Sequence, residues 1–417
     1  MAIATFFDLD IFQFDAVNAF LNAKLDEEVF VRNPDGFGDS NTCLRLVRAL
    51  YGLRRSPLLW LNDLSATLEA LGLRPVPEAQ CLFKSKHLIV FFYVDDICVL
   101  CHPSDRQYYH EFRTKIMRIY ELREIPYFKW FLGIRIVRDR TARKMWLCQD
   151  SYIEKIATSF NLTQSVPPKT PMIMDELTPY EGQATSQEIF AYQQRVGSIN
   201  YPAVTCRPDV SRTAQKLSEF LINPGYIHLA AADRAISYLY GTRTRSIEYN
   251  SLMLEALFQG SSDSAYADNS LTRRSTEGYL FMLFGGPIDW RSTKQSTVTT
   301  STTEAELLAL SHSAGQLYWW QRFFKDIELD LKQDYQLYCD NLQTVRLMLK
   351  ETPKLVTKLK HVDIHNLWLR QEVQRTNLKI EWICTADMKA DGFTKALPKE
   401  KHREFVRQLN LVDIKLE

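Results

Sequence analysis

The sequence has almost no excess of charge. Its 417 residues include 51 basic and 50 acidic side chains, which leaves a formal net charge of +1. No bulk positive field therefore attracts nucleic acid, and any such binding must come from local patches. The 46% of apolar and 12% of aromatic residues exclude a disordered chain and suffice for the cores of two or three domains.

The chain also lacks an uninterrupted apolar run long enough for a membrane helix. Its longest run, residues 88–101, contains Asp95 and Asp96, and it is shorter than the roughly 18 residues that a membrane span needs. The opening MAIATFFDLDIFQFD has no basic region, no sustained apolar core and no small-residue cleavage site. Neither secretion nor a membrane partner is indicated, so we expect an intracellular protein.

Several common ligand motifs are missing as well. No GxGxxG or GxxxxGK loop suggests a dinucleotide or ATP site, and no internal repeat is present. The one CxxC, Cys98 to Cys101, falls in a predicted strand, where its spacing points the thiols to opposite faces, so we expect reduced, buried cysteines. His361 and His365 form an i,i+4 pair without a third ligand, which favours an ordinary helix face over a transition-metal site.

Proline-rich joints divide the chain. The stretch 166–182 has four prolines and no steady period, so we expect an extended connector there, and a second boundary falls near residues 260–262. We expect an α+β multidomain protein with three parts, residues 1–135, 136–260 and 261–417.

The apolar pattern alternates between strand and helix periods. In the first part a strand ends at Asp15, a helix begins at Ser56, and HLIVFFY and ICVLC form a hairpin around a tight VDD turn. Between the connector and residue 260 the pattern is helical, with residues 191–201, 209–221 and 228–239 as the candidate helices. The last part predicts three strands, a long helix over 302–326, a strand over 335–340, two helices, a strand over 378–384 and a helical tail. A mixed sheet with helices packed on it is the simplest architecture.

Two adjacent carboxylates stand at the turn of the predicted hairpin. Asp95 and Asp96 repel each other, and the turn lacks the glycine that a surface turn usually prefers. Asp15, at the end of another strand, could complete a cage of oxygen ligands for Mg²⁺. Two ions held in this way stabilise both oxygens of a phosphoryl transfer. A charged hairpin tip without chemistry is the alternative.

Four further carboxylates are placed where a sheet could bring them together. Asp263 lies on a predicted strand, and Asp340 ends another. Glu306 lies in the first turns of the long helix, and Asp391 begins a late one. Four carboxylates in one cleft would repel one another unless metal ions neutralised them, and paired Mg²⁺ ions activate water on a phosphodiester. Glu304 competes with Glu306 for the second position.

The motifs around these carboxylates resemble the reverse transcriptase and RNase H regions of copia-type retrotransposon Pol polyproteins. YVDD at 93–96 is similar to the reverse transcriptase signature, and QFDAVNAFLNAKLDEEVFVRNPDGF from Gln13 is similar to the block around the first catalytic aspartate. SSDSAYADNS, TRRSTEGYLF, IDWRSTKQSTVTTSTTEAEL, LYCDN and ADGFTKALP follow the RNase H order. The resemblance implies a partial, ferredoxin-like palm, a helical thumb and connection region, and an RNase H-like mixed α/β domain.

The resemblance also implies site residues and cofactors. The family's catalytic glutamate directly precedes a large apolar residue, here Leu307, which favours Glu306 over Glu304. Each site would hold two Mg²⁺ ions, or Mn²⁺ in their place. The implied catalytic and metal-binding residues are Asp15, Asp95 and Asp96 for the polymerase and Asp263, Glu306, Asp340 and Asp391 for the nuclease.

Two positions concern nucleotide binding. Phe20 occupies the family's aromatic position that excludes ribonucleotides, with an ordinary core side chain as the alternative. ALYGLRRSPLLW at 49–60 resembles the family's LYGLKQAPRxW, but Arg55 replaces the glutamine that lines the nucleotide and template pocket. Family members carry a fingers region before the first aspartate, whereas fourteen residues precede Asp15. The resemblance therefore implies an N-terminally truncated polymerase whose synthesis is impaired, because the triphosphate would lose its cationic clamp.

The middle of the chain offers cations but no cluster of convergent titratable groups. Solvated helix faces are favoured over a nucleic-acid surface for these cations and their neighbouring aromatics. Core packing is favoured over base stacking for Trp319 and Trp320. The cations and aromatics are Arg195, Arg207, Arg212, Lys216, Tyr192 and Tyr201.

The predicted function is metal-dependent hydrolysis of RNA in RNA/DNA hybrids, attached to a truncated RNA-directed DNA polymerase. Expected partners are RNA/DNA hybrid, primer-template, dNTPs if the polymerase is competent, and other Pol products. Expected locations are a cytoplasmic virus-like particle and the nucleus. The alternative is a catalytically inactive relic or co-opted nucleic-acid-binding protein, which Arg55 favours and the seven retained carboxylates oppose.

Overall fold

The computed structural model describes residues 1–415 except 35, 38–41, 165, 253–256, 350–359 and 376–377. The chain forms two compact units. Unit 1 contains Met1–Phe6, Leu132–Gln321 and Leu331–Glu417, and unit 2 contains Phe7–Phe131 and Arg322–Asp330. The expected three-part division stays a prediction, and its boundary at 260/261 falls inside a strand that spans Phe258–Ala265.

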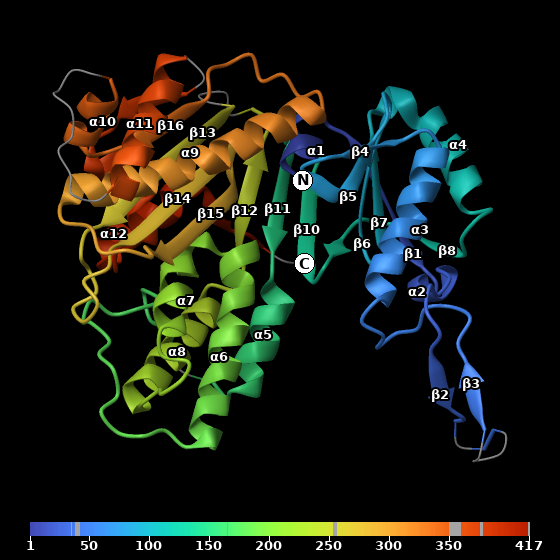
Figure 1. Cartoon of the computed structure of the whole chain (residues 1–417), viewed down its shortest axis with the longest axis horizontal. Helices are drawn as coiled ribbons and strands as arrows, with labels where there is room; N and C mark the ends of the chain where they lie inside the picture. The colour runs from blue at the N-terminus through green and yellow to red at the C-terminus, as the bar shows by residue number, and fades with distance from the viewer. Residues whose placement is uncertain are drawn as a thin grey trace. The chain divides into compact units, whose positions relative to one another are not determined.

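Unit 2 is built on an antiparallel sheet with the strand order β4-β5-β6-β7-β1-β8 (Figure 1). The expected hairpin is confirmed, because β6 and β7 pair from Leu88 opposite Cys101 to Tyr93 opposite Asp96. The strands are β1 (Asp10–Ala16), β4 (Arg74–Val76), β5 (Ala79–Lys84), β6 (Leu88–Tyr93), β7 (Asp96–Cys101) and β8 (Leu122–Ile125), with a separate pair of β2 (Phe30–Arg32) and β3 (Cys43–Arg45).

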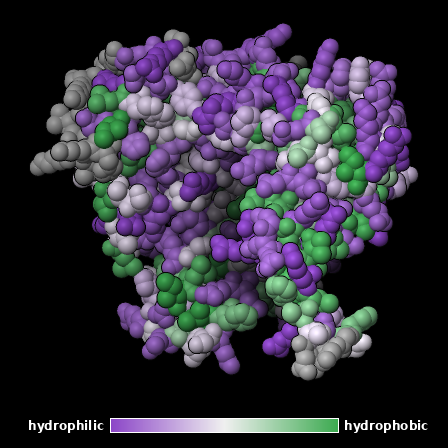
Figure 2. Space-filling model, turned by 45° about the vertical axis from the view of Figure 1, so that its right-hand side comes forward, coloured by the Kyte–Doolittle hydropathy of each residue, from purple (hydrophilic) through white to green (hydrophobic). Residues whose placement is uncertain are grey.

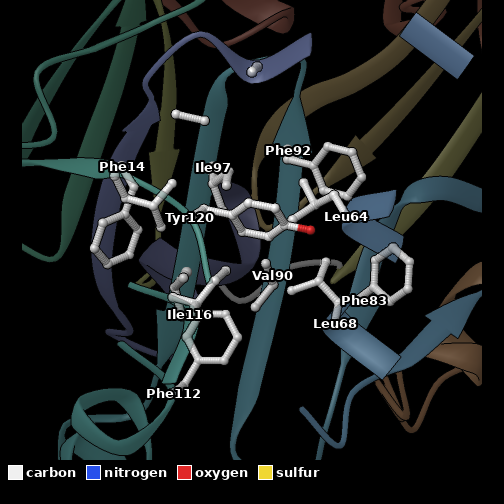
Figure 3. Close-up of a cluster of buried hydrophobic side chains, with 14 of the residues drawn as sticks. Phe14, Leu64, Leu68, Phe83, Val90, Phe92, Ile97, Phe112, Ile116 and Tyr120 are labelled. Carbon is white, nitrogen blue, oxygen red and sulfur yellow. The ribbon is translucent and has the colours of Figure 1, made fainter. Parts of the chain in front are cut away.

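Helices α3 (Ser56–Ala70) and α4 (Arg106–Ile116) cover this sheet with apolar side chains. Helix α3 begins at Ser56 as predicted, with Pro57 in its first turn, where the missing N–H costs nothing. Its Trp60, Leu64 and Leu68 recur every fourth residue and are fully buried. All three belong to the core of this unit. Figure 3 shows Leu64 and Leu68 in this core with Phe14, Phe83, Val90, Phe92, Ile97, Phe112, Ile116 and Tyr120.

Unit 1 contains a second sheet with the order β18-β12-β11-β10, built from antiparallel pairs. Four helices lie side by side near it, as Figure 1 shows. The strands are β10 (Ile134–Asp139), β11 (Lys144–Cys148), β12 (Arg245–Asn250) and β18 (Leu411–Asp413), and the helices are α5 (Asp150–Ser159), α6 (Ser186–Thr205), α7 (Ser211–Ser218) and α8 (Tyr226–Gly241).

A third sheet, also in unit 1, has the order β15-β14-β13-β16-β17. Strands β13, β14 and β15 pair antiparallel, whereas β16 joins β13 and β17 in parallel, so the sheet is mixed as expected. Helix α9 (Thr302–Asp326) crosses its face (Figure 1). The other elements are β13 (Phe258–Ala265), β14 (Thr276–Leu283), β15 (Gly286–Lys294), β16 (Gln336–Cys339), β17 (Lys379–Trp382), α10 (Leu342–Met348), α11 (Lys360–Gln374), α12 (Lys399–Gln408) and the 3₁₀ turn η4 (Asp391–Phe393).

The expectation of a wholly helical region before residue 260 was wrong. The region before residue 260 is not purely helical, because β12 pairs with β11 and with β18 from the C-terminal end of the chain. Such short strands have too few residues to establish a period, and distant partners define them. Helix α6 begins at Ser186, where Thr185 and Glu188 form a capping box, and it continues through Pro202.

The surface in Figure 2 is mostly hydrophilic, with apolar side chains in separate groups. Within the described residues no helix combines the length and apolarity needed to cross a membrane. Cys98 and Cys101 are buried and free, as predicted. Trp319 and Trp320 are half-buried, and the Trp320 indole donates a 3.0 Å hydrogen bond to Asp289.

Candidate active sites

Three of the four predicted nuclease carboxylates converge in unit 1. Asp263 is carried by β13, Glu306 by the second turn of α9, and Asp340 follows the last residue of β16. One ligand oxygen from each lies within 4.8 Å of the others. This proximity follows from the topology, because β13 and β16 are parallel neighbours and end at the same edge of the sheet. Asp263 and Glu306 are buried, and Asp340 is half-buried.

The fourth predicted carboxylate, that of Asp391, is linked to the cluster by Lys395. Asp391 begins η4, and its carboxylate is paired with the ammonium group of Lys395. The same Nζ lies 3.6 Å from Oδ2 of Asp263. A hydroxyl hydrogen bond from Thr394 to Oδ2 of Asp263 also ties this segment to β13.

Burial and crowding change the protonation of the cluster. Burial raises the pKa of Asp263 to about 6, with further contributions from Asp391 and Asp340, although Lys395 and Thr394 oppose the rise. Burial, followed by repulsion from Asp263 and Asp340, raises the pKa of Glu306 well above its usual range. Buried like charges disfavour ionisation, so a cation in the cluster would stabilise the charged forms.

The two glutamates at the start of α9 do different things. Glu306 accepts a 3.3 Å hydrogen bond from the backbone N–H of Ser264, next to Asp263. Glu304 instead accepts hydrogen bonds of 2.7 Å from the backbone and hydroxyl groups of Thr300, before the helix begins. Only Glu306 is therefore in position to act with the other carboxylates.

The three predicted polymerase aspartates occupy neighbouring backbone positions in unit 2, but within the described residues only Asp263, Glu306 and Asp340 bring ligand oxygens within 4.8 Å of one another. Asp15 on β1 lies directly opposite Asp96 on β7 in the antiparallel register. Asp95 occupies the turn before β7, and its carbonyl accepts a 2.8 Å hydrogen bond from the N–H of Ala16. The pairing of β1 with the hairpin thus aligns side chains that are about 80 residues apart in the sequence.

The turn that carries Asp95 has an unusual backbone. Val94 has a φ of 55°, although a β-branched side chain disfavours this region. The Trp60 indole donates a 2.6 Å hydrogen bond to the Val94 carbonyl and holds the turn against α3. A strained turn of this kind persists only where the surroundings hold it, and such turns are concentrated at functional sites.

Gln13 was not predicted as part of this site. Its amide donates a 2.9 Å hydrogen bond to Oδ1 of Asp96. Burial raises the pKa of Asp96, and the neighbouring Asp95 and Asp15 add to the rise, whereas the Gln13 hydrogen bond opposes it. Gln13 precedes Asp15 by two residues and so points to the same side of β1, which is the signal that could have identified it.

The residues predicted to bind nucleotide lie in different surroundings. Phe20, on the short helix α2 (Ala19–Asn22), is buried, and its ring centroid lies 4.4 Å from that of Tyr51. Burial raises the pKa of Tyr51, and repulsion from Asp95 contributes, which places Tyr51 near the carboxylates. Arg55 is exposed and paired with Asp26, with Glu27 at 4.0 Å.

The middle cations are not on solvated helix faces, so that interpretation was wrong. Arg207 is completely buried and pairs with Asp209. Arg212 pairs with Asp268, and Lys216 with Glu219, as parts of the protein interior. Arg195 pairs with Asp233 at 2.6 Å. A regular helical period cannot distinguish an exposed cation from a buried one whose carboxylate partner lies in another element.

The predicted histidine pair lies partly outside the described residues. Nδ1 of His365 lies 2.7 Å from the hydroxyl of Ser311, while the side chain of His361 is outside the described residues.

Lys395 is the residue of the nuclease-like site that the sequence pattern did not predict. The i,i+4 spacing of Lys395 from Asp391 could have predicted this contact, because it brings the two side chains to one face of a helical turn.

The chain resembles known proteins over most of its length. Residues 1–174 match the family model described as reverse transcriptase (RNA-dependent DNA polymerase). The Pol polyprotein of transposon TNT 1-94 from Nicotiana tabacum is 29% identical over 96% of this chain and 31% of its own length. The putative transposon Ty5-1 protein of Saccharomyces cerevisiae is 31% identical over 73% of this chain and its whole length. This chain thus spans about a third of the length of the Pol polyproteins that it matches.

A solved structure supports the same assignment at the level of the fold. The foamy viral protease-reverse transcriptase, solved in complex with an RNA/DNA hybrid, is 16% identical and aligns over 93% of this chain and 45% of its own, with a TM-score of 0.50. The chain therefore belongs to the reverse transcriptase family of copia-type retrotransposon Pol polyproteins and combines a reverse transcriptase fold with an RNase H-like fold.

Proposed function

We propose that unit 1 hydrolyses the RNA strand of RNA/DNA hybrids. The observation that carries this proposal is the convergence of Asp263, Glu306 and Asp340 at one edge of the third sheet, with ligand oxygens within 4.8 Å of one another. Asp391, held beside Asp263 through Lys395, completes the predicted set of four. A cluster of buried carboxylates destabilises the fold unless cations offset its charge, so its presence favours a catalytic role.

The chemistry of the cluster fits a divalent cation. Its converging ligand atoms are carboxylate oxygens from three separate elements, which hard cations such as Mg²⁺ prefer, and Mn²⁺ accepts the same donors. A bound Mg²⁺ would supply Lewis-acid activation of the phosphodiester and of the attacking water. Asp263, Glu306 and Asp340 would hold it, and the N–H of Ser264 and the hydroxyl of Thr394 would orient Glu306 and Asp263.

The choice of an RNA/DNA hybrid as the substrate rests on the family. Foamy viral protease-reverse transcriptase was solved with an RNA/DNA hybrid, which supports a hybrid as the ligand here. A cavity of about 600 Å³ is lined partly by Thr394 and Lys395, but none of the four carboxylates lines it, so it does not bear on the substrate. Hybrids are recognised mainly through backbone and 2′-hydroxyl geometry, so we expect little sequence preference.

The test is cleavage of an end-labelled RNA/DNA hybrid by the full chain in Mg²⁺. The wild type should cleave the RNA strand, and Asp340→Asn should abolish cleavage without unfolding the protein. Asp334→Asn is a matched control, because Asp334 is exposed and lies before β16 rather than after it. A folded wild-type chain that binds the hybrid without cutting it would contradict the proposal and favour a nucleic-acid-binding relic.

A second candidate function belongs to unit 2. The register of Asp15 with Asp96, and the adjacent Asp95, favour a cation-dependent site for nucleotidyl transfer to a primer. Phe20 and Tyr51 would then border the incoming dNTP. Arg55 has no amide to replace that of the family's glutamine, and its guanidinium is paired with Asp26, so we expect weak synthesis.

Primer extension on an RNA template tests this second function. Arg55→Gln restores the family's residue type and should extend the primer faster than the wild type. Adding Asp96→Asn to that variant should remove the gain. Equal rates for the wild type and Arg55→Gln would exclude Arg55 as the cause of weak synthesis.

A further inference from the structure

Lys395 lies between two of the nuclease carboxylates. Its Nζ is paired with Oδ1 of Asp391 and lies 3.6 Å from Oδ2 of Asp263. The backbone N–H of Lys395 also donates a 3.2 Å hydrogen bond to the carbonyl of Asp391. This helical turn directs both side chains to the same face, so the contact is a consequence of the backbone.

The segment that carries Lys395 is anchored to the sheet. The hydroxyl of Thr394 bonds to Asp263, and the carbonyl of Phe393 accepts a 2.6 Å hydrogen bond from the hydroxyl of Ser292 on β15. Phe393 and Thr394 are fully buried. These contacts hold the backbone next to Lys395 against the sheet, and they place the ammonium group within reach of Asp263, although the side chain is 42% exposed.

The carboxylates therefore form two groups that share Asp263. On one side Asp263, Glu306 and Asp340 bring their oxygens within 4.8 Å of one another. On the other side, Asp263 and Asp391 are bridged by Lys395. A cation placed between Asp263 and Asp391 would meet the ammonium group at close range, and two positive charges at that distance repel strongly in a partly buried site.

We propose that Lys395 is a positioning residue that occupies the second cation position, so that the chain without nucleic acid binds one divalent cation at the nuclease site. The proposal rests on the proposed nuclease function. A second cation must displace Lys395, so a neutral residue at this position allows a second cation to bind. Arginine retains the positive charge and prevents the second cation from binding.

The test is the stoichiometry of Mn²⁺ binding, measured by titration calorimetry on the full chain. Asp95→Asn and Asp96→Asn are introduced in every sample, so that only the nuclease site contributes. We expect the parent to bind one Mn²⁺ per chain and Lys395→Met to bind two. The affinity of Lys395→Met for the second Mn²⁺ should exceed that of the parent by at least about tenfold. Lys395→Arg should bind one. Lys399→Met is the matched control, because Lys399 is an exposed lysine four residues further on.

The outcomes separate the two proposals. Two ions of equal affinity in the parent and in Lys395→Met would overturn the role of Lys395 and leave the metal-dependent nuclease intact. No Mn²⁺ binding by the parent or by Lys395→Met would contradict the proposed function itself. Circular dichroism verifies the fold, and Lys395→Gln, which keeps a polar side chain, replaces the methionine variant if that variant unfolds.

Discussion

Arg207 and Asp209 form a two-point ion pair in the interior of unit 1, with both Nε–Oδ1 and Nη2–Oδ2 at 2.8 Å and both side chains fully buried. The hydroxyl of Tyr238 donates a further 2.7 Å hydrogen bond to Asp209. Its oxygen in turn lies 2.8 Å from Nε2 of His402 on α12. One carboxylate thus connects the start of α7 with α8 and the C-terminal helix.

We expect Asp209→Asn to lower the free energy of unfolding by about 3 kcal/mol or more, because it leaves the Arg207 cation buried without its counter-charge. Urea unfolding at pH 7 measures the change. Asp233→Asn is the matched control, since the Arg195–Asp233 pair is partly exposed and should contribute less than about 1 kcal/mol. Equal losses in the two variants would show that burial of the Arg207 pair is not what matters.

Stability should fall in weak acid because of His402. Burial lowers the pKa of His402 to about 4, whereas an unfolded histidine titrates near 6.5. Between these values the unfolded chain binds the proton and the folded chain does not, so stability declines as the pH falls from about 6.5 towards 4. The loss from this group approaches about 3 kcal/mol at the lower end.

His402→Gln cannot titrate and should flatten this part of the pH profile. The measurement is the urea midpoint at pH 7, 5.5 and 4.5 for both proteins. Other groups also titrate in this range, so the comparison concerns the difference between the two profiles. Parallel profiles would exclude His402 as the source of the acid sensitivity.

Substitutions of the two glutamates of α9 should have different effects, one on catalysis and the other on stability. Glu306→Gln removes a carboxylate from the cluster and should reduce hybrid cleavage by about 100-fold or more. Glu304→Gln weakens two hydrogen bonds from Thr300 and should instead cost about 1 kcal/mol of unfolding free energy while cleavage persists. Cleavage rates and thermal unfolding are measured on both variants. The reverse pattern would assign the catalytic role to Glu304.

Gly278 should be required for the geometry of the nuclease-like site. It lies opposite Asp263 on β14, and a Cβ there would approach the Cβ of Phe393 to 2.6 Å. Gly278→Ala must therefore push η4, with Asp391, away from β13, and cleavage should drop at least tenfold. Hybrid cleavage and unfolding are measured together.

Gly315→Ala is the control for this substitution. Gly315 lies within α9 and has open space around its Cα, so alanine should add up to about 1 kcal/mol of stability through helix propensity and leave cleavage unchanged. A similar loss of cleavage in both variants would point to a general effect of replacing glycine in this unit.

The sequence by itself determined the local elements and the chemistry-bearing residues. The alternation of HLIVFFY and ICVLC around VDD predicts the β6–β7 hairpin, because side chains in a strand alternate between faces and a two-residue turn sets the register. The long helix was predicted with the bounds observed for α9, since it combines apolar periodicity with a polar start. The carboxylates could be identified in the same way, because acidic side chains at strand ends and helix starts stand out from an apolar pattern.

Only the tertiary structure decided which of these side chains meet and which cations become buried. Parallel pairing of β13 with β16 brings Asp263 and Asp340 to one edge, and η4 brings Lys395 to Asp263 from more than 100 residues away. Likewise, nothing in the local pattern separates Arg207, which is buried, from an exposed arginine. The physical reason is that burial depends on distant elements, as for Arg207, which pairs with its neighbour Asp209 but also donates a hydrogen bond to the carbonyl of Thr242. Helix and strand periods depend only on residues within a few positions of one another.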